Sequence, residues 1–345
     1  MRIMFRLSLL CALALLGAAR PLPAAPSVAT LGSDVSTRAA ALALFNAEYR
    51  SPSAAAPIEW TGQPAPTCMI GATSAAFRAA TLQRINYFRA AAGLGPVSLS
   101  EEYSLKAQAA ALMVQANPTK LSHKMYPPEQ WRCHTTAGQD AGATSNLAQG
   151  SNGPDAIDGY MFDYGEGNKD AGHRRWLLYP QTQRMGTGDT ATIFWGVPYP
   201  ETNVLWVLDD QINAPDPAVR DGFVAWPPQG FAPYQVVFPR WSFSVADANF
   251  ATATVSVTSG GQPVQVEVES RSANYGNPTL VWRMAGLGAS VSWPKPSADT
   301  PYQVTITGVQ VGGESRSYSY SVTVFDPDKS VFAPTNWSYL PLVRR

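Results

Sequence analysis

Three residues with chemically useful side chains, His123, Asp163 and His173, stand out in a chain of 345 residues that has only three histidines. His173 lies in residues 171–180, next to a glycine, two arginines and large apolar side chains. His123 precedes it by fifty positions, and Asp163 lies between the two. Imidazole and carboxylate groups bind divalent metals and transfer protons. These residues are therefore candidates for a metal site or an acid/base site.

Periodic apolar residues predict three helices that position the two histidines. Ser74 caps the first helix, which ends at Gly93, and a second helix follows the capping box of residues 98–101 and stops before Pro118. A third helix begins at Pro154. Two extended segments come after His173, at residues 192–195 and 203–208. Helices followed by strands within residues 74–212 indicate an α+β or α/β domain built in layers.

The C-terminal half shows a different pattern, with short alternating strands between turns. A proline-containing linker at residues 213–217 precedes it, and residues 312–313 mark a glycine hairpin. We predict an all-β sandwich of immunoglobulin type, without an internal disulfide, over residues 220–327. The predicted strands are residues 235–238, 252–257, 264–268, 280–283, 302–307 and 317–324. Residues 25–212 are expected to fold without this half.

The N-terminus has the pattern of a secretory signal peptide. Residues 1–24 combine arginines, a ten-residue apolar run and small residues at the expected cleavage site. Their removal leaves 22 basic and 25 acidic side chains, a balance that disfavours nucleic acid as a partner. No other apolar run is long enough to cross a membrane. The mature protein is therefore expected to be secreted or periplasmic, with a leader at residues 25–73 and a tail at residues 328–345.

Cysteine usage agrees with export. Cys11 lies in the apolar part of the signal peptide, so only Cys68 and Cys133 remain in the mature chain. A pair of cysteines in an exported protein indicates a disulfide, here closing a loop of about 65 residues. The alternative is two free, buried cysteines.

Five motifs follow one another between about Ala75 and Asp209. They are residues 84–94 (RINYFRAAAGL), 107–112 (AQAAAL), 121–123 (LSH), 145–148 (SNLA) and 172–176 (GHRRW). In this order they resemble the CAP superfamily of cysteine-rich secretory proteins, antigen 5 and pathogenesis-related 1, also called the SCP domain, and the Gly-His-Arg element is typical of its bacterial branch. The similarity covers about 40% of the chain. The resemblance implies a three-layer α-β-α sandwich.

In that family a central cavity usually holds two histidines and two acids, which bind a divalent metal such as zinc in some members. The resemblance maps the histidines to His123 and His173. One acid maps nearest to Asp163, with Glu166 less well aligned, and the other maps to Ser145, which is not an acid. Two imidazoles and at most one carboxylate leave zinc as an open possibility, completed by water. Otherwise the cavity is a degenerate one.

Several neighbouring residues have two interpretations. Ser145 either supports a histidine on the cavity rim or acts as a nucleophile, although no Gly-x-Ser-x-Gly motif surrounds it. Arg174 either clamps an anionic ligand at the rim or pairs with acids. His134, beside a cysteine, is interpreted as a surface or packing residue. Three tryptophans either line a carbohydrate or lipid groove or pack in the core: Trp176, Trp195 and Trp206.

Two classes of function follow from these residues. The favoured one is a non-enzymatic, exported binding module for a lipid, a sterol or another extracellular ligand, including a protein, with no nucleic acid as a partner and no membrane span. The alternative is a metal-dependent hydrolase or peptidase that uses His123, His173 and a carboxylate. A structural protein of the cell envelope fits the same composition. The missing acid at Ser145 favours binding.

The disulfide gives the first test. Free-thiol titration of the denatured, unreduced mature protein should find no reactive thiol, because Cys68 and Cys133 are joined. The same titration after reduction should find two. Two thiols before reduction would refute the bridge.

Overall fold

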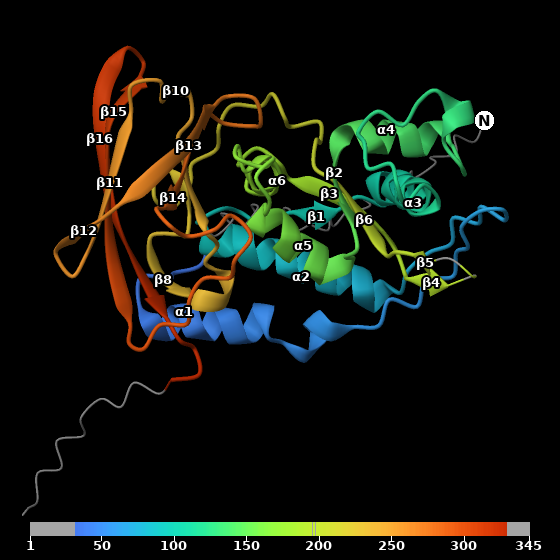
Figure 1. Ribbon diagram of the computed structural model, residues 1–345, viewed down its shortest axis with the longest axis horizontal. Coiled ribbons are helices and arrows are strands. Elements are labelled where there is room, and N and C mark those ends of the chain that lie inside the picture. Colours follow the sequence, from blue (N-terminus) through green and yellow to red (C-terminus); the bar gives the residue numbers. More distant parts are fainter. Residues whose placement is uncertain (1–31, 195, 197, 330–345) are drawn as a thin grey trace, which may run out of the picture.

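The computed structural model describes residues 32–194, 196 and 198–329. The predicted signal peptide, residues 1–24, and residues 330–345 of the predicted tail lie outside this range. Within the described ranges, every helix is too short or too polar to span a bilayer. The predicted fold class is confirmed, because a three-layer α-β-α domain is followed by an all-β sandwich (Figure 1).

The N-terminal domain is built on a sheet of four strands. The order is β1 (Ser98–Leu99), β3 (Arg184–Thr190), β6 (Thr202–Trp206) and β2 (Ser145–Gln149). β1 runs parallel to β3, whereas the pairs β3–β6 and β2–β6 are antiparallel. Segments far apart in the sequence thus meet at the sheet, and β2 begins at Ser145, one of the candidate site residues.

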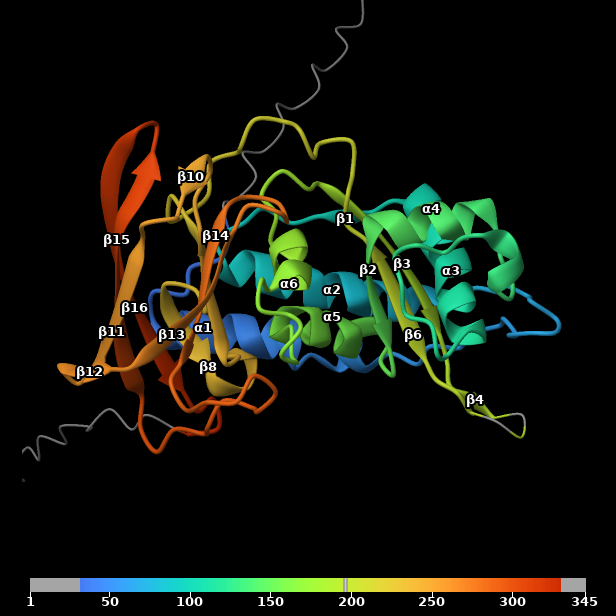
Figure 2. The same ribbon diagram turned by 45° about the horizontal axis from the view of Figure 1, so that its top comes forward.

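Helices cover both faces of this sheet (Figures 1 and 2). On one face lie α3 (Glu101–Ala116) and α4 (Thr136–Thr144). On the other lie α2 (Ala75–Ala91), α5 (Gly153–Phe162) and α6 (Gly172–Leu177). The short α6 carries His173.

Alternating side chains of β6 build the two cores of this domain. Val204 and Trp206 pack with the alanines of α3, whereas Leu205 packs with α2 and α5. Successive side chains of a strand point to opposite faces, so one strand serves both layers. The approach of α3 is close, since a Cβ on Gly188 of β3 would lie 2.1 Å from the backbone nitrogen of Gln108.

The helix predictions are confirmed, with a corrected cap. Ser74 caps α2, its side chain accepting a hydrogen bond from the backbone of Phe77. The second helix is capped by Ser100 rather than by Ser98, because Ser98 pairs with β3 as part of β1. Within the described residues, the strand predicted at residues 192–195 contains β4 (Ile193–Phe194), which pairs antiparallel with β5 (Pro198–Tyr199).

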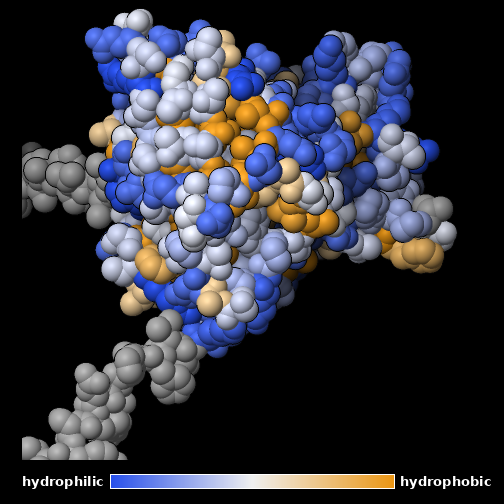
Figure 3. All heavy atoms as spheres, turned by 60° about the vertical axis from the view of Figure 1, so that its left-hand side comes forward, coloured by the Kyte–Doolittle hydropathy of each residue, from blue (hydrophilic) through white to orange (hydrophobic). Residues whose placement is uncertain are grey.

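The C-terminal half is a sandwich of two sheets. In both, antiparallel pairs predominate, and β8 is parallel to β16. One sheet has the order β12 (Gln262–Val264), β11 (Thr254–Ser259), β15 (Thr300–Val311), β16 (Glu314–Phe325) and β8 (Gly230–Pro233), with β10 (Ala248–Asn249) beside β15. The other has the order β13 (Val266–Ser272), β14 (Thr279–Met284), β9 (Arg240–Ser244) and β7 (Val224–Trp226). The face in Figure 3 is mostly hydrophilic, with hydrophobic residues gathered in several separate areas, the most extended of them near the centre.

One strand prediction in this half is wrong, and a second is only partly right. Residues 235–238 overlap a 3-10 turn, Tyr234–Val236, instead of forming a strand. Residues 264–268 span the break between β12 and β13. The four others coincide with parts of β11, β14, β15 and β16. The predicted division at residues 212 and 220 stays a proposal.

The segment before α2 spans the two halves. It contains α1 (Arg38–Leu44), the π-helix Phe45–Tyr49 and the 3-10 turn Pro52–Ala55, and a further 3-10 turn, Pro128–Gln130, follows His123. Arg38 donates to the backbone oxygen of Asp326 at the end of the sandwich. The Cys68–Cys133 disulfide is confirmed and ties this segment to the loop before α4.

The sandwich and the N-terminal domain share a core. Trp226 of β7 is 1% exposed and packs in the cluster formed by α2 and α5. Its ring meets Phe88 of α2 edge to face, with centroids 5.2 Å apart. Phe238, also from the sandwich half, stacks on Phe162 at 5.2 Å. Although the composition favours independent folding of residues 25–212, this packing argues for one cooperative unit.

Replacing Trp226 with Ala is expected to lower the free energy of unfolding by about 3–5 kcal/mol, as is typical of buried large aromatic side chains. Far-UV and near-UV circular dichroism should report one shared transition in denaturant, shifted to lower concentration. Phe194→Ala is the control, because Phe194 is 72% exposed. Separate transitions of the two halves in the parent protein would contradict the shared core.

Candidate functional site

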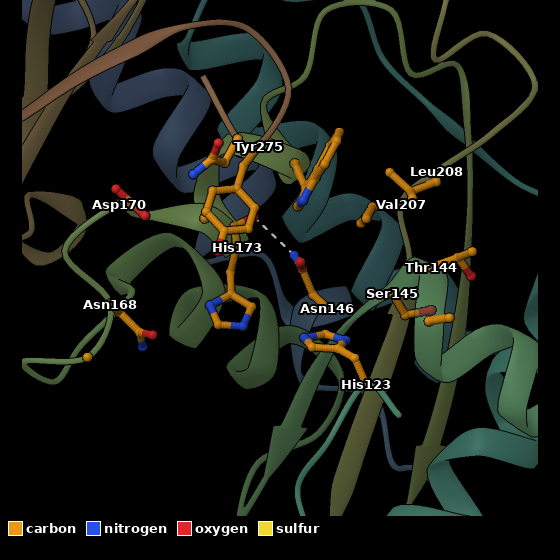
Figure 4. Close-up of a pocket in the computed structure, with 15 residues that line it drawn as sticks. His123, Thr144, Ser145, Asn146, Asn168, Asp170, His173, Val207, Leu208 and Tyr275 are labelled. Atoms are coloured by element: carbon orange, nitrogen blue, oxygen red, sulfur yellow. Dashed lines mark hydrogen bonds between the residues drawn. The ribbon is translucent and has the colours of Figure 1, made fainter. Parts of the chain in front are cut away.

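One cavity, of about 400 Å³, brings His123 and His173 together (Figure 4). This volume lies in the range of ligand pockets, about 300–1,000 Å³. Its walls come from the end of α4, the start of β2, α6 and a loop of the sandwich. The lining residues are His123, Ala143, Thr144, Ser145, Asn146, Gly167, Asn168, Asp170, Gly172, His173, Trp176, Val207, Leu208, Asn274 and Tyr275.

Asp163 fixes the orientation of His173. Asp163 is 1% exposed and ends α5 in the left-handed conformation, with φ 53°. Its Oδ1 lies 2.7 Å from Nδ1 of His173, and its Oδ2 accepts from the backbone nitrogen of the same residue at 3.0 Å. One carboxylate thus holds both the ring and the main chain at the start of α6. The predicted partnership of Asp163 with a histidine is present in the structure.

His123 is held by a backbone group instead of a carboxylate. Its Nδ1 lies 2.9 Å from the carbonyl oxygen of Gly142. A carbonyl oxygen only accepts hydrogen bonds, so Nδ1 carries the proton. The Asp163 carboxylate imposes the same tautomer on His173. In their neutral forms both rings therefore keep Nε2 unprotonated and available to a ligand.

Asn146 and Ser145, at the start of β2, complete the polar floor of the cavity. Nδ2 of Asn146 donates to the backbone oxygen of His173 at 3.0 Å, which ties the strand to α6. Ser145 is 5% exposed, and its Oγ makes no hydrogen bond within the described structure. The expected bond from Ser145 to a histidine or a backbone group is therefore not formed.

Two predicted rim residues lie elsewhere. Glu166 is outside the lining, and its exposed carboxylate lies 3.8 Å from Arg283 of the sandwich. Arg174 is fully buried and donates to the backbone oxygens of Met161 and Arg240, because its side chain leaves α6 toward the second domain. Burial lowers the pKa of Arg174 to about 10, so the guanidinium stays charged at neutral pH.

Other lining residues were not predicted as site residues. Asn168 and Asp170 lie in the turn between α5 and α6, and Asn274 and Tyr275 come from the loop between β13 and β14. Neither segment has a motif that would mark it. Among the tryptophans, Trp176 lines the cavity, Trp206 packs in the core against Tyr103, and Trp195 lies outside the described residues.

The residues present do not fit a zinc site. Zinc sites use three or four ligands. Both carboxylate oxygens of Asp163 are hydrogen-bonded to His173, and Ser145 occupies the position where the resemblance implies an acid. Within residues 32–194, 196 and 198–329, no three His, Cys, Asp or Glu side chains are grouped closely enough to hold a metal ion. The two imidazoles are thus a pair of hydrogen-bonding groups.

Residues 82–191 match the model of the cysteine-rich secretory protein family, CAP. The chain therefore contains a CAP domain, as the order of its motifs predicted. None of the curated proteins compared with the chain matches it. Solved structures similar to part of the chain include PcoC, a methionine-rich copper resistance protein from Escherichia coli, with 14% identity and a TM-score of 0.22, covering 29% of this chain and 92% of that one. CopC from Methylosinus trichosporium OB3b has 14% identity and a TM-score of 0.22, covering 32% of this chain and 97% of that one.

The tautomers of the three histidines provide a test. Nitrogen-15 NMR at a pH where the imidazoles are neutral should show the proton on Nδ1 in His123 and His173. His134 is an internal control in which the proton should be on Nε2 instead, because its Nε2 lies 3.1 Å from Oε1 of Gln139, which accepts hydrogen bonds. Asp163→Leu should remove the preference in His173 and leave His123 unchanged. Protonated Nε2 in both cavity histidines of the parent protein would contradict this geometry.

Proposed function

We propose that this chain is an exported protein whose CAP domain binds an extracellular ligand in the histidine cavity and does not convert it. Export is supported by the signal-peptide pattern of residues 1–24 and by the disulfide, since disulfides are rare in reducing compartments. The mature protein is accordingly assigned to the periplasm or the extracellular space.

One observation carries the binding function. Both imidazoles are anchored through Nδ1 to protein acceptors and leave Nε2 for the cavity. The side chains of Asn146 and Asn168 line the same cavity. Convergent polar groups in a preformed pocket are the usual features of a ligand site.

Hydrolysis is the second candidate, favoured by the Asp163–His173 pair, which resembles a base and the group that orients it. Two facts support binding instead. Ser145, the candidate nucleophile considered from the sequence, makes no hydrogen bond to either histidine. The metal-dependent form of the reaction lacks its ligand set among the described residues.

Metal analysis separates these candidates. The purified full-length protein should contain no stoichiometric zinc, and calorimetric titration with Zn²⁺ should show no binding tighter than tens of nanomolar, the range expected for a complete site. The double variant His123→Ala/His173→Ala should likewise contain no stoichiometric zinc and show no tight binding of Zn²⁺. Stoichiometric zinc that this double variant loses would support the hydrolase.

Thermal shift with defined compounds tests binding itself. Palmitate, cholesterol, cellotetraose and chitotetraose represent the ligand classes. At least one should raise the Tm of the parent protein, since ligand at about 100 times its Kd stabilises by about 2.7 kcal/mol. The double histidine variant should show no shift. No effect in the parent, or breakdown of the compound by it, would count against a binding role.

A further inference from the structure

The sandwich contributes one wall of the histidine cavity. Asn274 and Tyr275, from the loop between β13 and β14, are among its lining residues. Figure 4 shows Tyr275 on the same side as His173, with His123 and Ser145 across the cavity. The contact is close, because a Cβ on Gly172 would lie 3.4 Å from three carbons of the Tyr275 ring. The site is therefore composite.

Arg175 of α6, two positions after His173, holds the loop between β13 and β14 in place. Nη2 of Arg175 donates to the backbone oxygens of Ser272 and Asn277, at 2.9 and 3.0 Å, one on each side of the loop tip. The guanidinium also lies over the ring of Tyr275, 5.5 Å from its centroid. Tyr275 is 37% exposed, so part of a positioned ring is open to solvent. An aromatic surface held in this way is preorganised for a ligand.

The lining excludes several ligand classes. Among the described residues, the lining contains no lysine or arginine and one carboxylate, that of Asp170, so it offers no fixed cation to a fatty-acid carboxylate or a phosphate. A sterol, with one hydroxyl, would desolvate the Nε2 atoms of the two imidazoles and offer a hydrogen bond to at most one of them, which is costly. A neutral ligand rich in hydroxyl groups remains.

Sugar rings have this character, with hydroxyls around the edge and an apolar C–H face. The aromatic rings of Tyr275 and Trp176 supply surfaces for the face, and the imidazole and amide groups supply partners for the hydroxyls. We propose that the cavity is a binding site for a neutral oligosaccharide, shared by the two domains, in which Tyr275 of the sandwich determines specificity. This proposal rests on the binding function proposed for the same cavity.

Calorimetry with the full-length protein tests it, with cellotetraose, chitotetraose and maltotetraose as probes. At least one should bind the parent. Tyr275→Ala should raise its Kd at least about tenfold through loss of the ring contact, and Tyr275→Phe should stay within about threefold. Phe194→Ala, at an exposed aromatic residue outside the lining, should leave Kd unchanged. Asn274→Ala is the second loop variant, used if Tyr275→Ala lowers the Tm.

The outcomes distinguish the proposed oligosaccharide site from the ligand-binding function proposed for the same cavity. If the parent binds palmitate or cholesterol but no oligosaccharide, and His123→Ala/His173→Ala loses that binding, the oligosaccharide proposal is wrong and the binding function of the cavity stands. Sugar binding that the double histidine variant loses, and that neither loop variant weakens, overturns the role of the sandwich. No binding by any of these compounds overturns both proposals.

Discussion

The buried Asp163 joins the parts of this structure. A buried carboxylate is costly unless it is paired and hydrogen-bonded, and here its two oxygens hold the ring and the main chain of His173. The backbone oxygen of Asp163 accepts a hydrogen bond from Arg240 of the sandwich at 2.6 Å. One residue thus orients a cavity histidine through its side chain and docks the second domain through its main chain. Both contacts therefore depend on the position of Asp163.

Two arginines extend this coupling across the domain boundary. Arg174 leaves α6 toward β9 and donates to the backbone oxygen of Arg240, while Arg175 leaves the same helix toward the β13–β14 loop. Both follow His173 directly in the sequence, so the short α6 carries a cavity histidine and two side chains that contact the sandwich. The sandwich is accordingly part of the site, and it is more than a spacer attached to a CAP domain.

The sequence predicted the parts of the structure that depend on local patterns. Ser74 and the apolar spacing after it define α2, and scarce histidines in ordered motifs point to the cavity. It missed what depends on distant contacts. Tyr275 reaches the cavity through a loop held by a bond between residues 102 positions apart, Arg175 to Asn277. A two-residue strand such as β1 is too short to show a hydrophobic period. Because β1 was missed, the cap of α3 was predicted at Ser98, two positions before the observed cap, Ser100.

Ser145 shows what the loss of an acid does to such a cavity. An acid at this position, which the family resemblance implies, would add a negative charge near two imidazoles and complete a ligand set. A serine adds a neutral hydroxyl, and this one is buried without a hydrogen-bond partner in the described structure. A buried polar group without a partner costs about 1–3 kcal/mol. Because that oxygen is closed off from the cavity, the substitution removes one candidate metal ligand and gives a bound molecule no new hydrogen-bonding group in its place.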